Sequence, residues 1–583
     1  MRFRRLPALF VAVLLVCAGC TPEAMTPSQT LASQGWSDAD RQEFYTTGQG
    51  SRLIPYRWFR ALRRLDADAA FGADALQRYG YLPNAVSAAN PEKLPVGFTL
   101  DGPAESAHLG MTCAACHTAR IEYRGQALRI DGGRANADFQ AFLTDLTAAA
   151  RATRDTPARF DNFATSVLGA NPTDADKLKL REEFAAWVGG FGDFMDKSLP
   201  TPSWGPGRLD AFGMIFNRVT SLDLNIPANM APADAPVRYP FLWDAPRQDK
   251  TQWNGAAPNG LYLLGLIRNT GEVMGVFAQF NPHRVGGLPG LRPILRYDTS
   301  ADMRGLQTLE EKIAKLRPPA WPREMFGYDQ ALADKGKALF NANCVQCHSQ
   351  DASRRIANSW ATLLQDVGTD PRMATNAGRM GETGIMADTT PSALIQPPLG
   401  AQAPKAKILA SAVIGAVLQQ AEADLFPPDA FQRSGVWEAV RRDFEDLANP
   451  GEGAGQPLAR QRTVRGVEQR LGEIYARPAT KASGAAYEGR FLSGIWAVGP
   501  YLHNGSVPNL WSLLQPATAR PTRFMVGSRE FDPKNVGFAT DRSPFNATFV
   551  VDAGNGNGNG GHEYGTGLSE ADKWALIEYM KGL

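Results

Sequence analysis

Cys344-Val345-Gln346-Cys347-His348 ends a helical pattern that begins at Gln330, and Cys113-Ala114-Ala115-Cys116-His117 repeats its spacing. Cys-x-x-Cys-His is the attachment signature of c-type haem. Two thiols at this spacing can form thioethers with the two vinyl groups on one porphyrin edge, and the following imidazole then lies beneath the iron. The sequence therefore predicts two covalently bound haem c groups, held by Cys113 and Cys116 and by Cys344 and Cys347, with His117 and His348 as iron ligands.

Other interpretations of the cysteine pattern fit this chain less well. Cys-x-x-Cys also marks zinc sites and thiol redox centres. Zinc ribbons place their two pairs close together, whereas these pairs lie at 113–116 and 344–347. A thiol redox centre needs no following histidine, yet both pairs have one in a chain with only six histidines. Haem attachment is therefore the favoured interpretation.

Helix signals around the second motif indicate the plan of a class I cytochrome c. A helix is predicted over 330–343, leading into Cys344, and Ser569 is predicted to cap a terminal helix that runs to Leu583. A C-terminal haem domain is therefore expected over 329–583. A proline-rich linker, expected over 318–328, precedes it.

The N-terminal haem domain is expected over 37–317, with Ser37 capping its first helix. A stretch rich in Pro, Trp, Asp and Asn over 200–259 indicates a long irregular insertion. The predicted fold class is mainly α, with two cytochrome c-type haem domains, long irregular loops and little β structure. Helices are predicted over 138–151 and 174–190, helical spacing of apolar residues over 261–280, and a short hairpin over 119–130.

The N-terminus has the layout of an export signal. Met1-Arg2-Phe3-Arg4-Arg5 precedes an apolar run over 6–16, which is too short to span a membrane. The run ends at Cys17-Ala18-Gly19-Cys20, which resembles a bacterial lipobox with Cys20 as the lipidated residue, although Cys17 stands where leucine is usual. We expect a lipoprotein signal peptide over 1–20 and a polar tether over 21–36. Ordinary signal cleavage near Cys20 is the alternative.

Export agrees with haem c, because this attachment is made outside the bacterial cytoplasm. Thr21, in place of aspartate, favours outer-membrane sorting, so we expect a periplasmic or cell-surface protein that meets the membrane only through its lipid. No other segment has about twenty apolar residues, so no transmembrane helix is predicted. The net charge of +2 gives no sign of a nucleic-acid partner.

The remaining histidines are candidates for the ligand opposite His348. A haem iron with protein ligands on both faces mainly transfers electrons, whereas an open face admits dioxygen or peroxide. His562 lies just before the terminal helix, where class I cytochromes supply their sixth ligand, and is predicted to bind the second iron. His503 is the runner-up.

The first haem has no such candidate nearby. No histidine lies between His117 and His283, and His108 is too close to the motif to reach over the ring. We therefore expect an open first haem, with Met214 or Met230 as the alternative ligand.

Longer segments outside the motifs resemble a known family. Residues 491–510 are similar to the C-terminal haem domain of the bacterial di-haem cytochrome c peroxidase and MauG superfamily. Other segments resemble one branch of it, the RoxA-like di-haem rubber oxygenases, and the resemblance covers most of the mature chain. These segments are 94–98, 111–117, 129–133, 210–217 and 241–246.

The resemblance assigns a role to each haem. In rubber oxygenases the N-terminal haem is the active site, with a single histidine ligand that corresponds to His117 and dioxygen on the opposite face. Their C-terminal haem has two histidine ligands, which correspond to His348 and His562. Classical di-haem peroxidases carry a histidine in a loop soon after the first motif, and its absence here weakens that alternative.

Three residues are candidates for catalytic roles. Glu272 resembles the distal glutamate region of the superfamily and would act as a general acid, or it is a helix N-terminal carboxylate. Phe280 is a candidate for an apolar pocket, with core packing as the alternative. Trp253 is a candidate for carrying an electron between the haems, with a structural role as the alternative. Further candidates are Phe277, Ile215 and Phe216 for the pocket and Trp243 for the electron.

Three functions follow from these predictions. The first is a dioxygenase that cleaves carbon–carbon double bonds of an apolar, polyisoprene-like substrate at the N-terminal haem, while the C-terminal haem transfers electrons. The second is a peroxidase that reduces hydrogen peroxide with electrons from a small periplasmic carrier. The third is an electron-transfer cytochrome without substrate chemistry.

Overall fold

The structure is a computed structural model that describes residues 28–285, 294–349, 355–356, 359–389, 399–425, 436, 442–443 and 485–583. The expected signal peptide, with Cys20, and the first part of the expected tether lie outside these ranges. Within them, no helix is both long and apolar enough to cross a membrane.

The first cysteine motif joins two small sheets. It forms the short helix α3 (Cys113–Cys116), which follows β4 (His108–Met111) and precedes β5 (Thr118–Tyr123). One sheet has the order β2-β4-β3 and the other β1-β6-β5, in which β5 and β6 form the predicted hairpin. Strands on both sides of the motif therefore fix its position in the fold. The other strands and the first helices are β1 (Ser28–Leu31), β2 (Ile54–Pro55), β3 (Phe98–Asp101), β6 (Gln126–Asp131), α1 (Asp38–Thr46) and α2 (Tyr56–Ala61).

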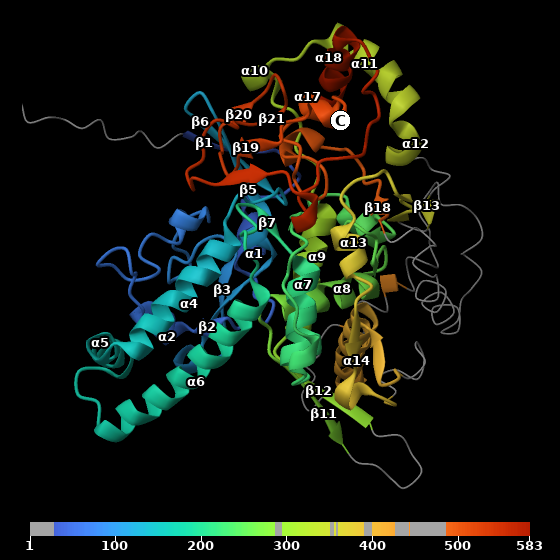
Figure 1. The fold of residues 1–583 in the computed structure, drawn as a ribbon. Helices are drawn as coiled ribbons and strands as arrows, with labels where there is room; N and C mark the ends of the chain where they lie inside the picture. The colour runs from blue at the N-terminus through green and yellow to red at the C-terminus, as the bar shows by residue number, and fades with distance from the viewer. Residues whose placement is uncertain are drawn as a thin grey trace, which may run out of the picture.

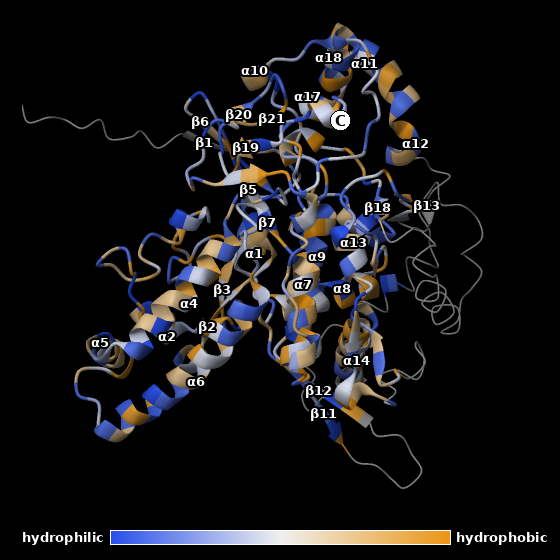
Figure 2. Ribbon diagram, viewed as in Figure 1, coloured by the Kyte–Doolittle hydropathy of each residue, from blue (hydrophilic) through white to orange (hydrophobic). Residues whose placement is uncertain are grey.

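Three helices extend from this region, the first and the last side by side and the second joining their far ends (Figure 1). They are α4 (Phe139–Asp155), α5 (Pro157–Leu168) and α6 (Asp174–Ser198). Apolar and polar residues alternate along α4 and α6 (Figure 2), as expected for helices that bury one face. Asp138 and Thr173 cap α4 and α6, and α6 is longer than predicted. Ser37 caps α1 as predicted.

The central part of the chain is more ordered than predicted. The expected irregular insertion contains α7 (Ala211–Phe216), which continues into a π-helical segment over 217–222. The helical pattern over 261–280 forms α8 (Tyr262–Gly275) and then ends, because Phe280 begins the hairpin of β11 (Phe280–Val285) and β12 (Ile294–Thr299). The other helices of this part are α9 (Met303–Lys315), α10 (Arg323–Phe326), α13 (Arg372–Asn376) and α14 (Lys405–Leu425).

Helices from the two ends of the C-terminal region pack together above the second motif. The predicted helix α11 (Gln330–Asn343) leads into α12 (Val345–His348), and α18 (Glu570–Lys581) lies against α11 (Figure 1). The rings of Phe340 and Tyr579 lie 5.3 Å apart between them. Gly336 permits the close approach, because a Cβ atom there would lie 1.9 Å from the Ala575 carbonyl oxygen.

Gly336→Ala is therefore expected to lower stability by about 2 kcal/mol, the usual cost of an overpacked contact. The control is Gly189→Ala on α6, where a Cβ atom would have no neighbour within 4 Å. This control is expected to gain up to about 1 kcal/mol from helix propensity. Thermal unfolding of both variants measures the difference, and equal melting temperatures would contradict the proposed contact.

The prediction of a mainly α fold with little β structure is wrong. The chain is 43% helical and 16% strand, in many sheets of two or three strands. Strands of two or three residues are too short for an alternating apolar pattern, so the sequence did not reveal them. The short pairs are β7 (Arg208–Leu209) with β8 (Val237–Arg238), β9 (Lys250–Thr251) with β10 (Ala257–Pro258), β13 (Arg355–Ile356) with β14 (Ser359–Trp360), β15 (Leu364–Gln365) with β18 (Tyr487–Glu488), β16 (Met380–Glu382) with β17 (Gln402–Pro404), β19 (Arg523–Met525) with β22 (Thr548–Val550), and β20 (Phe531–Asp532) with β21 (Gly537–Phe538).

Candidate functional site

The second motif orients its histidine through a backbone contact. The Nδ1 atom of His348 lies 2.6 Å from the Arg490 carbonyl oxygen, so Nδ1–H donates to this carbonyl. The neighbouring Gly489 packs against Cys347, where a Cβ atom would lie 2.9 Å from the Cys347 carbonyl oxygen. A metal-binding histidine commonly donates its other ring N–H to a carbonyl, which leaves Nε2 as the ligand atom.

His562 faces His348. The two ring centres lie 6.3 Å apart, with an interplanar angle of 53°. Two imidazoles on opposite sides of one metal ion, each with a bond of about 2 Å, have ring centres about 6 Å apart. The spacing therefore suits one iron between the rings of His348 and His562.

The loop that carries His562 is held from both sides. The His562 N–H donates to the Val367 carbonyl oxygen at 2.8 Å. The Arg520 guanidinium donates to the carbonyl oxygens of Asn559 at 2.7 Å and of Gly561 at 2.8 Å. His562 itself has a positive φ of 48°, a strained conformation for a residue that is not glycine. This local cost is consistent with a ligand whose position is set by its surroundings.

His503, the runner-up ligand, has a different neighbour. Its ring stacks on Tyr487 at 3.9 Å between ring centres, with an angle of 18°. Its carbonyl oxygen accepts from the Arg238 N–H at 2.8 Å. Burial lowers the pKa of His503 to about 3, so this imidazole is neutral. The stacking gives His503 a packing role.

The ligand chemistry of both motifs suits haem c. In His562 the Nδ1 atom is buried without a partner among the other described residues, whereas the Pro240 backbone is a hydrogen-bond partner of the His117 ring. Both residues are only partly buried overall. Burial is the main cause that lowers the pKa of each of these two imidazoles to about 4, which keeps them in the neutral, metal-binding form. The four motif cysteines are free thiols at the same sites.

The first motif has one imidazole. The nearest ring to His117 is that of Tyr239, at 5.9 Å between centres. His108 lies on β4, paired with Asp101 of β3, and His283 lies 3.5 Å from Asp298 on the β11–β12 hairpin. Since His503 and His562 lie elsewhere, no second histidine among the described residues faces His117.

A polar cluster lies beside the first motif. The carboxylates of Glu272 and Glu310 are close enough to Cys113 to raise the pKa of its thiol, although burial is the larger cause. Gln252 donates to Glu272 at 2.8 Å, and Arg268 donates to Glu310 at 2.6 Å. Desolvation raises the pKa of Glu272. The structure therefore brings the predicted acid Glu272 to the first site, in the last half of α8 and away from its N-terminus.

The apolar candidates divide between clusters. Phe277 belongs to the same core cluster as Ala115, with Cys116 packed against it. Phe280 belongs to another cluster, and its ring stacks on Tyr297 at 5.5 Å. This contact places Phe280 in core packing between β11 and β12, the alternative expected for it. Ile215 shares the Phe280 cluster, and Phe216 stacks on Phe212 beside Trp253.

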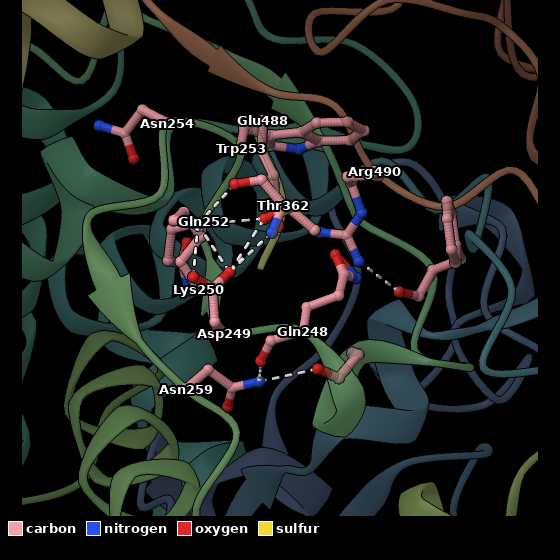
Figure 3. A network of polar contacts seen from close by, with 12 residues as sticks. Gln248, Asp249, Lys250, Gln252, Trp253, Asn254, Asn259, Thr362, Glu488 and Arg490 are labelled. Carbon is pink, nitrogen blue, oxygen red and sulfur yellow. Dashed lines mark hydrogen bonds and ion pairs between the residues drawn. The ribbon is translucent and has the colours of Figure 1, made fainter. Parts of the chain in front are cut away.

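Trp253 contacts two arginines that lie near the motifs. The guanidiniums of Arg134 and Arg490 lie 5.6 Å and 5.5 Å from the centre of its ring. Both positive charges also lower the pKa of His117, and the Arg490 carbonyl oxygen accepts a hydrogen bond from His348. The Trp253 carbonyl accepts from the Glu488 N–H at 2.7 Å, and Figure 3 shows Trp253, Glu488 and Arg490 together. By contrast, Trp243 is fully buried and donates to the Ser493 carbonyl at 2.7 Å, which is a packing role.

Sequence patterns did not predict several residues of these sites. Arg490 contributes through its carbonyl, and any residue type could supply that atom. Tyr239 lies far in the sequence from His117, whose ring it faces, and Gln252 lies 20 residues from Glu272, to which it donates. Arg520 holds the His562 loop from 42 residues away. None of these has a signature in spacing, and only an alignment of relatives would reveal them.

Comparisons with known proteins agree with a haem protein. Residues 486–525 match a family model described as RoxA-like, cytochrome c-like. This match begins at the segment that packs against Cys347 and His348. The uncharacterized protein y4iM of Sinorhizobium fredii (strain NBRC 101917 / NGR234) is 25% identical over 60% of this chain and 62% of its own length. The uncharacterized protein y4iJ of the same organism is 31% identical over 95% of this chain and 93% of its own length.

The y4iJ match spans nearly the whole of both proteins, and the RoxA-like match covers the region beside the second motif. The cytochrome c-like region indicates haem c as the cofactor and a function related to that of cytochromes. The chain belongs to the same family as y4iJ and carries a RoxA-like, cytochrome c-like region.

Proposed function

We propose that the chain is a di-haem c-type oxidoreductase that cleaves carbon–carbon double bonds of an apolar, polyisoprene-like substrate. One dioxygen molecule reacts with one double bond, both bonds between the alkene carbons break, and each carbon receives one oxygen atom as a carbonyl. The atoms and electrons balance without a reductant. A haem at the first motif supplies the redox iron that lets dioxygen react with an alkene.

The contrast between the two motifs carries this proposal. His348 has His562 opposite it at metal-binding distance, whereas His117 has no such partner among the described residues. A site with ligands on both faces suits electron transfer, and a site with one ligand suits a reaction. The first motif is therefore assigned the substrate chemistry.

Residues around the first motif suit an apolar substrate and a single proton. Phe277 is in the cluster that contacts the motif, and Phe212 and Phe216 pack beside Trp253. Desolvation raises the pKa of Glu272, so its carboxyl group takes up a proton more readily than an exposed one, as a general acid requires.

The second candidate function is peroxidase activity. The position of Trp253 beside two arginines that lie near the motifs favours it, because an aromatic ring there suits transfer of electrons from the second site to the first. Two electrons and two protons would reduce hydrogen peroxide to two waters. A small periplasmic electron carrier would then be the partner.

The test is mass spectrometry of polyisoprene incubated in air with the purified protein, without peroxide or reductant. The expected products are oligo-isoprenoids ending in an aldehyde at one end and a ketone at the other. Oxygen-18 gas is expected to label both carbonyls. The absence of product would contradict the proposal for this polymer, and shorter apolar olefins then test the wider class.

A second arm separates the two functions. Hydrogen peroxide consumption is measured with a reduced small cytochrome as donor and no olefin. Rapid oxidation of the donor, together with no olefin cleavage, would support the peroxidase instead.

The proposed location of the protein is outside the cytoplasm. An exported, lipid-anchored protein, with Cys20 as the modified residue, would act in the periplasm or on the cell surface. An anchored enzyme suits substrates that reach the outer membrane. Globomycin, which blocks lipoprotein signal cleavage, is expected to cause accumulation of the uncleaved precursor.

A further inference from the structure

Two buried arginines between the motifs lack an acidic partner. Arg134 is 5% exposed and Arg238 is 2% exposed. Arginine is rarely buried to this extent unless it is paired, because removing its charge from water costs on the order of several kcal/mol. None of the carboxylates that the structure describes pairs with either guanidinium.

The hydrogen bonds of these arginines are incomplete. Arg134 donates to the carbonyl oxygens of Val498 and of Pro500, the latter at 2.7 Å, and Arg238 donates to that of Gly499 at 3.0 Å. The Nε atoms of both arginines are buried without a partner among the described residues. Both guanidiniums are thus tied to one turn and each retains a buried donor.

The two arginines place like charges in one buried region. Burial is the main cause that lowers the pKa of Arg134, and the charge of Arg238 lowers it further. The neighbouring groups that shift the pKa of Arg134 are Arg238, Tyr501 and Arg490. Those that shift the pKa of Arg238 are Tyr239 and Tyr501. None of these is a carboxylate. The folded chain therefore leaves a net positive charge in its interior, where an anion is needed.

The location indicates which anion. The Ala135 N–H, next to Arg134, donates to the Cys116 carbonyl oxygen at 3.0 Å, and the ring of Tyr239, next to Arg238, lies 5.9 Å from that of His117. The Arg134 guanidinium lies 5.6 Å from the Trp253 ring centre, and the Trp253 indole N–H donates to the Arg238 carbonyl oxygen at 2.8 Å. Each haem c carries two propionate carboxylates, and arginine binds carboxylates with strong, charge-assisted hydrogen bonds.

We propose that Arg134 and Arg238 bind haem propionates at the junction of the two Cys-x-x-Cys-His sites, beside Trp253. This inference rests on the proposed di-haem cofactor and does not depend on the substrate. The arginines hold the propionates ionised in the protein interior. Their positive charges also stabilise the reduced, more negative state of the haem that they contact.

The experiment is a spectroelectrochemical titration of the purified holoprotein and of Arg134→Gln and Arg238→Gln. We expect the equilibrium constant for reduction of one haem to fall about tenfold in each variant, which is about 59 mV for one electron. Arg134→Lys keeps the charge and is expected to stay near the wild-type potential. Arg218→Gln is the control, because Arg218 is partly buried but pairs with Asp223 at 3.9 Å and donates to the Ala278 carbonyl.

A second measurement identifies the propionates. The propionate bending band in the resonance Raman spectrum is expected to shift in Arg134→Gln and Arg238→Gln and to stay in place in Arg218→Gln. Potentials and bands that move no more than in the control would overturn the inference, and stabilisation of the wild type by added phosphate would then indicate a free anion. Haem content below two per chain would instead contradict the di-haem cofactor itself. If Arg134→Gln does not fold, Arg238→Gln and Arg134→Lys still decide the question.

Discussion

A Cys113→Ala, Cys116→Ala variant is expected to keep one haem per chain and to lose olefin cleavage by at least a hundredfold. The physical reason is that the thioethers hold the first haem, and His117 alone at this site would bind it weakly. The second site keeps both of its histidines, His348 and His562, and its own pair of cysteines. Pyridine haemochrome absorbance measures the haem content, and mass spectrometry of the products measures the activity.

The matched control is Cys344→Ala, Cys347→Ala, which also removes one haem. If the first site carries the oxygenase chemistry, this variant retains measurable cleavage, because the balanced reaction needs no external electrons. A peroxidase would lose activity in both variants, since its electrons pass through the second site. Cleavage that survives the first change but not the second would reverse the proposed roles.

Local signals in the sequence predicted local structure well. The pattern over 330–343 forms the helix α11, Ser37 and Ser569 act as caps, and the hairpin over 119–130 is present. Each of these depends on residues within one or two turns of one another. Capping and short-range periodicity are therefore sufficient to specify them.

Structure that depends on distant segments was not predictable in the same way. The two-residue strands β15 and β18, for example, pair with each other across more than a hundred residues of sequence. The Arg490 carbonyl beside His348 and the Arg134–Trp253 contact depend on the folded chain as a whole. The chemistry of the motifs was thus visible in the sequence, whereas the surroundings that tune it were not.

His562→Ala is expected to convert the second haem almost completely from a six-coordinate, low-spin state to a five-coordinate, high-spin state. The reason is geometric, because the His562 ring is the one that faces His348, with ring centres 6.3 Å apart. Removing it leaves iron with one protein ligand, and small added imidazole is expected to restore the low-spin spectrum. Electron paramagnetic resonance and the visible absorption bands report the change.

His503→Ala is the matched control for this prediction. His503 stacks on Tyr487 at 3.9 Å, so its loss removes packing and leaves the low-spin signal in place. The opposite result, a high-spin haem in His503→Ala and an unchanged one in His562→Ala, would exchange the two assignments. His562→Ala would also leave a chain in which both haems have an open face. A gain of peroxide reactivity at the second site of this variant would show that the second histidine is what restricts the site to electron transfer.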